Sequence, residues 1–118
     1  MTVIDYRAQA AQARKDADKY RRWSVADARF AARQYEAVRS LKAHARFLTH
    51  FPPLWSPHNT PGEIEEMARV ALRVADLYLY GTFMNAESSR ACRELARSWA
   101  ALAEQQERQL ATLAGQQV

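Results

Sequence analysis

All four prolines of this 118-residue chain lie between positions 52 and 61, inside the stretch THFPPLWSPHNTPGE (residues 49–63). Only three glycines are present, at positions 62, 81 and 115. Because proline and glycine are the residues that most often interrupt helices, the sequence on either side of this stretch can continue as long helices. So few glycines also leave little material for β-hairpins or phosphate-binding loops. The sequence therefore predicts an all-α fold.

The size and composition are those of one folded domain, which we expect to span residues 1–118. Apolar residues make up 48% and charged residues 25% of the chain, a balance that favours a packed core over disorder. No apolar run is long enough to cross a membrane, and the first residues lack the apolar segment of a secretory signal. Cys92 is the single cysteine and cannot form an internal disulfide, so we expect a cytoplasmic protein.

A first helix is predicted over residues 4–48, which contain no proline or glycine. Its apolar residues recur at alternating intervals of three and four, as on one helix face. They are Tyr6, Ala10, Ala13, Ala17 and Tyr20, and then, on a shifted face, Trp23, Phe30, Ala37 or Val38, Leu41, Ala45 and Leu48. The sequence SVAD at 24–27 resembles a capping box with Asp in place of Glu. We expect one long helix; a kink or break near Ser24 is the alternative.

A second helix is predicted over residues 61–80, after a proline-rich loop at 49–60. Thr60, Pro61 and Glu63 form a T-x-x-E capping box with proline at the first helical position. Gly81 can end this helix. Its polar residues form one narrow stripe, so we expect it to be the central helix, with Leu72 and Val74 enclosed. The polar stripe consists of Glu66, Arg69, Arg73 and Asp76.

A third helix is predicted over residues 86–114, capped by Asn85. The residues of one stripe, apolar at first and with glutamines among them after Leu102, recur with the spacing of a coiled coil. They are Cys92, Leu95, Trp99, Leu102, Gln106, Gln109 or Leu110, and Leu113. The predicted fold is therefore an antiparallel bundle of three long helices, or of four if the first helix breaks near Ser24.

The helix lengths predict a homodimer. At 1.5 Å per residue the first helix is about 66 Å long, against about 30 Å and 43 Å for the other two. A helix that extends so far beyond its neighbours needs another partner. The alanine stripe between Tyr6 and Tyr20 suits close helix packing, so we expect residues 6–23 to form part of the dimer interface.

The residue types that carry catalysis or hold metals occur without the spacing that these sites need. His44, His50 and His58 form no metal-binding motif with one another or with Cys92. The carboxylates Glu63, Glu65 and Glu66 fall in the first turn of a helix, where they favour the helix dipole. We therefore predict a protein that is not an enzyme and that has no cofactor and no metal site.

The proline-rich loop is the predicted binding site for another protein. Prolines stiffen the backbone on which Trp55 lies, and tryptophan is the residue most enriched at interface hot spots. The candidate residues are Phe51, Leu54, Trp55 and His58. The alternative is that this loop folds over the end of the bundle as an apolar plug. A small helical inhibitor, adaptor or chaperone-like module, of the kind found in bacteria and on phages, is the predicted function.

Binding of nucleic acid, or of another acidic partner, is the alternative function. Residues 1–48 carry eleven Lys and Arg against five Asp and Glu. Basic side chains interleaved with Tyr20 and Trp23 could contact phosphates and stack on bases. The basic residues are Arg14, Lys15, Lys19, Arg21, Arg22 and Arg29. An ordinary solvated helix face, or attraction between two oppositely charged parts of a bundle, explains the same charges.

Overall fold

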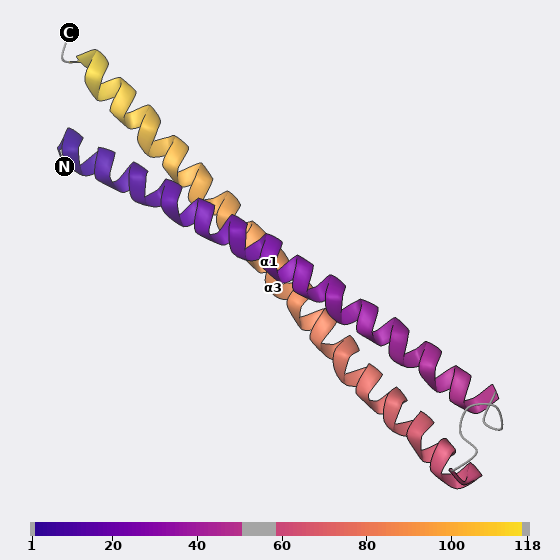
Figure 1. Cartoon of the computed structure of the whole chain (residues 1–118). Coiled ribbons are helices and arrows are strands. Elements are labelled where there is room, and N and C mark those ends of the chain that lie inside the picture. The colour runs from indigo at the N-terminus through magenta and orange to yellow at the C-terminus, as the bar shows by residue number, and fades with distance from the viewer. Residues whose placement is uncertain (1, 51–58, 117–118) are drawn as a thin grey trace. The chain divides into compact units, whose positions relative to one another are not determined.

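The computed structural model describes residues 2–50 and 59–116, and this part of the chain forms two helices (Figure 1). Helix α1 runs from Val3 to His50 and helix α3 from Pro61 to Gln116, with no strand in the described ranges. The all-α prediction is confirmed. The prediction of three or four helices is wrong, because neither α1 nor α3 breaks where the sequence suggested.

Gly81 and Asn85 lie inside α3, although they were predicted to end one helix and begin the next. No described glycine has a positive φ, so Gly81 does not adopt the conformation of a C-terminal cap. A Cβ at Gly81 would lie 2.5 Å from Nε2 of Gln34, so glycine allows close approach of α1. The Asn85 amide donates hydrogen bonds to Gln34 Oε1 and to Gly81 O, each at 2.8 Å. Both residues therefore serve contacts between the helices.

Ser24 also lies inside a continuous helix. Its hydroxyl donates to Ser89 O at 2.9 Å, and the Ser89 hydroxyl donates to Ser24 O at 2.8 Å. The Ser88 hydroxyl donates to Asp27 Oδ2 at 2.6 Å. The SVAD sequence resembles a capping box because serine and aspartate suit caps, but here both side chains bind the opposite helix.

The same pattern does form a cap at TVID, residues 2–5. The Asp5 amide donates to Thr2 Oγ1 at 3.2 Å, and the Thr2 amide donates to Asp5 Oδ2 at 3.0 Å. The side-chain hydrogen bond from Thr2, together with the bond from its backbone amide, lowers the pKa of Asp5. This reciprocal pair satisfies two amides at the start of α1.

The predicted cap of α3 is confirmed. The Glu63 amide donates to Thr60 Oγ1 at 3.2 Å, and the Thr60 hydroxyl donates to Glu63 Oε1 at 3.1 Å. Pro61 is the first helical residue, where its missing N–H breaks no hydrogen bond.

We expect Thr60→Ala to lower the free energy of unfolding by about 1 kcal/mol, because a helical amide loses its acceptor. Urea denaturation followed by circular dichroism measures this change. Thr112→Ala is the matched control, because the Thr112 hydroxyl donates to Arg108 O inside the helix and caps nothing. Equal midpoints for the two variants would contradict a stabilising cap at Thr60.

The two helices meet along an antiparallel seam whose residues recur at alternating intervals of three and four. This is the heptad spacing of a coiled coil. In α1 the seam positions, all buried or half-buried, are Val3, Tyr6, Ala10, Ala13, Ala17, Tyr20, Ser24, Asp27, Ala31, Gln34, Val38, Leu41, Ala45 and Leu48. In α3 they are Ile64, Ala68, Ala71, Ala75, Tyr78, Thr82, Asn85, Ser89, Cys92, Ala96, Trp99, Ala103, Gln106, Leu110 and Leu113, of which Tyr78 alone is exposed.

Alanine dominates this seam. Of the twelve buried apolar residues in the described part of the chain, nine are alanines. The stripe from Tyr6 to Tyr20 is confirmed, but Trp23 and Phe30 are 51% and 50% exposed. Leu95 and Leu102 are also exposed. Large side chains predicted to face the core lie outside it, because a seam spaced for alanine has no room for them.

Tertiary contacts divide the chain into two units, each built from one segment of α1 packed on one segment of α3. Unit 1 comprises Met1–Asp27 and Glu87–Val118. Its helices are joined across the seam by the Ser24–Ser89 bonds and by an ion pair between Arg14 and Glu107 at 3.0 Å. The hydrogen bond from Arg14 lowers the pKa of Glu107, and the same bond raises the pKa of Arg14.

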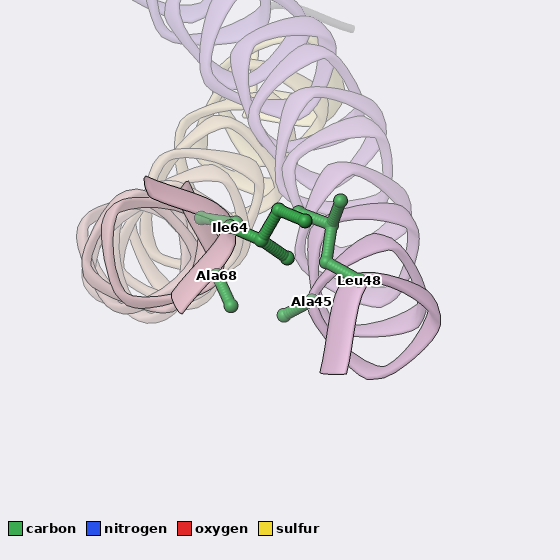
Figure 2. Packing of buried hydrophobic residues seen from close by; sticks show 5 residues of the cluster. Ala45, Leu48, Ile64 and Ala68 are labelled. Carbon is green, nitrogen blue, oxygen red and sulfur yellow. The ribbon is translucent and has the colours of Figure 1, made fainter. Parts of the chain in front are cut away.

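Unit 2 comprises Ala28–Ala86. Ala45 and Leu48 of α1 pack there against Ile64, Ala68 and Ala71 of α3, and Figure 2 shows four of these residues facing one another. Leu48 is 1% exposed and is one of the two largest fully buried side chains among the described residues. This cluster of small and medium side chains is the apolar core of unit 2.

The first helix, from which a dimer through residues 6–23 was predicted, does not extend beyond its neighbour. Helix α3 has 56 residues and α1 has 48, so α1 does not outrun its partner. Ala10, Ala13 and Ala17 are buried within unit 1 of the same chain. No helix in the described part of the chain is long and apolar enough to cross a membrane.

Candidate functional site: the apolar surface of unit 2

Unit 2 exposes most of the large apolar side chains that the chain leaves uncovered. Of the seventeen exposed large apolar residues in the described ranges, twelve belong to unit 2. They are Phe30, Tyr35, Phe47, Met67, Val70, Leu72, Leu77, Tyr78, Leu79, Tyr80, Phe83 and Met84. A surface so rich in apolar residues is typical of a binding site.

The α3 segment of unit 2 is apolar on nearly all sides, as its narrow polar stripe predicted. Glu66 pairs within that stripe with Arg69 at 3.4 Å and with Arg73 at 3.5 Å. One helix, α1, covers the alanine side of this segment. The prediction of a fully enclosed helix is wrong for Leu72, which is exposed, and only partly right for Val74, which is half-buried. The sequence therefore predicted an apolar helix correctly, but in the described part of the chain only α1 packs on it.

The exposed residues fall on two sides of the seam. In an antiparallel coiled coil, residues that directly follow equivalent seam residues lie on the same side. Thr49 follows Leu48 and Glu65 follows Ile64, and both line one hollow at the end of the seam, as this rule requires. Residues that directly precede seam residues lie on the opposite side.

The first side carries an aromatic patch, which we define as Tyr35, Leu72, Leu79 and Phe83. Tyr35, Leu72 and Leu79 each directly follow a seam residue, and Phe83 lies one helical turn beyond Leu79. All four are exposed.

Two basic residues border the aromatic patch. Arg39 and Lys42 lie one and two turns after Tyr35 on α1. Both side chains are exposed and neither forms an ion pair with any residue in the described ranges. The patch thus combines tyrosine, phenylalanine and free positive charge, a composition enriched at protein interfaces.

The second side carries an apolar stripe, which we define as Met67, Val70, Val74, Leu77 and Met84. Met67 and Val74 directly precede the seam residues Ala68 and Ala75. With Gly81 counted between Leu77 and Met84, successive positions of the stripe are separated alternately by three and four residues. No charged residue occupies any of these positions.

The residues predicted to form a binding loop, Phe51, Leu54, Trp55 and His58, lie outside the described residues. The loop therefore stays a prediction.

Both the aromatic patch and the apolar stripe were missed as sites, because large apolar residues at helical spacing were assigned to the core.

Three of the six predicted basic residues have partners. Arg14 pairs with Glu107, and Arg21 pairs with Asp18 at 2.9 Å. Lys19 lies 3.9 Å from Asp16 and over the Tyr20 and Trp23 rings. The other three, Lys15, Arg22 and Arg29, are exposed along α1 at seven-residue spacing.

Helix α3 adds basic residues that the sequence did not single out. Arg93 and Arg97 line a shallow groove of unit 1 together with Arg14, Arg21 and Asp18. Positive charge is nevertheless spread evenly over the chain. Unit 1 has ten basic and eight acidic residues and unit 2 has seven and five, so each has a net charge of +2.

The structure offers no metal centre in residues 2–50 and 59–116, where no three His, Cys, Asp or Glu side chains converge. His50 falls at the end of α1, and His58 lies outside the described residues. Cys92 is a half-buried free thiol in the seam.

Comparison with known proteins assigns no family. The chain matches no protein-family model, no curated protein and no solved structure.

Proposed function

We propose that this chain is a non-enzymatic protein-binding module that occupies a surface of another protein through the aromatic patch of unit 2. The observation that supports this most is the concentration of twelve exposed large apolar residues in unit 2, beside a seam of alanines. Aromatic anchors, Tyr among them, supply much of the binding energy at protein interfaces once the partner buries them. The module would act as an inhibitor, adaptor or chaperone-like protein.

The residues around the patch suggest the chemistry of its partner. Arg39 and Lys42 are unpaired in the described part of the chain and border the patch on α1. A partner that presents an apolar surface edged by carboxylates would cover the patch and pair both charges. Such rim charges affect the association rate more than the affinity.

The double variant Tyr35→Ser/Phe83→Ser should abolish capture of the partner. Both residues are exposed, so the melting temperature should stay within a few degrees of wild type, while loss of two anchors weakens binding by ~30-fold or more. Tagged protein is incubated with lysate of the native organism, and captured proteins are identified by mass spectrometry. Affinity for the protein so identified is then measured by calorimetry.

Leu95→Ser provides the matched control, because Leu95 is an exposed apolar residue of unit 1. It should capture the same partner as wild type. Capture that survives the double variant, or that is lost equally in Leu95→Ser, would argue against the aromatic patch. A partner lost only on Trp55→Ala would assign binding to the predicted loop.

Nucleic-acid binding is the second candidate, supported by the arginines of unit 1. Arg14, Arg21, Arg93 and Arg97 line one groove there, and such a groove could follow a phosphate backbone. Arg14 and Arg21 are paired with carboxylates, and the positive charge is spread evenly over the two units. Nucleic-acid binding is therefore less well supported than protein binding. Heparin retention separates the two: steep loss of retention with salt supports nucleic acid, whereas elution at low salt supports the protein partner.

A further inference from the structure

The shallow groove of unit 1 gathers positive charge from both helices. Four arginines line it, two from α1 and two from α3: Arg14, Arg21, Arg93 and Arg97. Each directly follows a seam residue, so all four lie on one side of the seam. The lining contains one carboxylate, that of Asp18. The groove therefore holds more positive charge than its own lining neutralises.

The two arginines of α3 are the ones left without partners. Both arginines of α1 are paired with carboxylates, at 3.0 Å and 2.9 Å. Arg93 and Arg97 are exposed and form no ion pair with any residue in the described ranges. Residues four positions apart on a helix have their Cβ atoms about 5–6 Å apart. One anion can therefore contact both guanidinium groups.

Contacts across the seam place Arg21 beside this pair. Ser24 of α1 is hydrogen-bonded to Ser89 of α3. Because the helices are antiparallel, Arg21, three residues before Ser24, lies at nearly the same level as the residue four positions after Ser89, which is Arg93. Three guanidinium groups, those of Arg21, Arg93 and Arg97, thus meet in one part of the groove.

The chemistry of the lining selects an anion with several oxygen acceptors. Guanidinium groups donate hydrogen bonds and accept none. The remaining lining residues are Ala17, Ala96 and Ala100, whose methyl groups do neither. Phosphate oxygens match the planar, forked donors of arginine and accept two hydrogen bonds at once. The groove volume of about 280 Å³ is close to the lower end of the range for small-molecule sites, about 300–1,000 Å³.

We infer that this groove binds a phosphate-bearing ligand, with a phosphate group held between Arg21, Arg93 and Arg97. A nucleic-acid backbone and a free oligophosphate present the same oxygen atoms. The inference rests on the second candidate function if the ligand is a nucleic acid, and stands without it if the ligand is a free oligophosphate. It does not involve the aromatic patch, because every residue of the groove belongs to unit 1.

The double variant Arg93→Gln/Arg97→Gln should weaken phosphate binding by ~10-fold or more, because each lost guanidinium removes charge-assisted hydrogen bonds. Calorimetry at one fixed salt concentration measures the affinity, with inorganic tripolyphosphate and a single-stranded oligothymidylate as the two probes. Both positions are exposed and glutamine is a good helix former, so the melting temperature without ligand should stay near the wild-type value.

Lys15→Gln/Arg22→Gln is the matched control, because it removes two exposed positive charges of unit 1 that do not line the groove. This variant should bind tripolyphosphate as the wild-type chain does. Equal weakening in the two double variants would mean that net charge attracts the ligand, and would overturn the inference. So would a wild-type chain that binds neither probe, or one that binds a triglutamate peptide as tightly as tripolyphosphate.

The two probes also separate this inference from nucleic-acid binding. If tripolyphosphate displaces the oligothymidylate and the groove variant weakens both, a nucleic-acid backbone is the source of the phosphate. If tripolyphosphate alone binds, and the groove variant weakens it, the inference stands while the second candidate function fails. Oligothymidylate binding that the groove variant leaves unchanged would support that function at another surface and refute the inference.

Discussion

Replacing Ala75 by Asp should unfold unit 2. Ala75 is 0% exposed in the middle of the seam, so the new carboxylate would be buried without a partner. Burying an unpaired charge costs several kcal/mol, which approaches the whole stability of a small domain. We expect the helical signal in circular dichroism to fall sharply at 25 °C, and amide hydrogens of Ala28–Ala86 to exchange rapidly.

Ala43→Asp is the matched control, since it places the same charge on an exposed position of α1 in the same unit. Arg39 and Arg46 lie one turn away on either side, so this carboxylate has basic neighbours. Its melting temperature should stay near the wild-type value. A folded Ala75→Asp chain with normal exchange in unit 2 would mean that α1 and α3 do not meet at Ala75.

Leu48→Ala should lower the free energy of unfolding by 2 kcal/mol or more, within the range of about 2–5 kcal/mol for a buried leucine. Leu48 packs in the cluster formed with Ala45, Ile64, Ala68 and Ala71, whose small side chains cannot expand to fill the space. Urea denaturation measures the loss. Leu95→Ala, at an exposed leucine, should change stability by less than about 1 kcal/mol. Equal losses in the two variants would exclude Leu48 from the core.

Helix propensity and the cap at Thr60 were predictable from the sequence. The cap formed by Thr60 and Glu63 was recognised, because the T-x-x-E pattern with proline at the next position has a specific local geometry. The stripe from Tyr6 to Tyr20 was recognised from its period. These features depend on residues a few positions apart, so no knowledge of the opposite helix is needed to interpret them.

The number of helices could not be predicted in the same way. Gly81 and Asn85 are residue types common at helix ends. Here Gly81 leaves room for the Gln34 side chain, and the Asn85 amide donates a hydrogen bond to Gln34. Ser24 and Asp27 resemble a cap, but they bind Ser89 and Ser88 of α3. In each case a residue from 47 to 65 positions away decides the local conformation. Only the tertiary fold brings these pairs together.

The helix that carries the candidate site was predicted, but the site itself was not. The narrow polar stripe of residues 66–76 indicated an apolar helix, which the structure confirms. Leu72 was assigned to the interior because exposed apolar faces are uncommon on a monomer, and it is exposed. Larger residues were preferred to alanine as core residues. That preference fails where helices approach closely enough for alanine to fill the space between them.

An alanine seam has a consequence for alignment. If one helix slid past the other by seven residues, about 10 Å, alanine would again meet alanine at several seam positions. The alanine contacts therefore stabilise the helix pair but discriminate little between alignments. The polar contacts discriminate between them. After such a slide Ser89 would face an alanine instead of Ser24, and the Gln34–Asn85 hydrogen bond would be lost. Alignment errors thus cost hydrogen bonds.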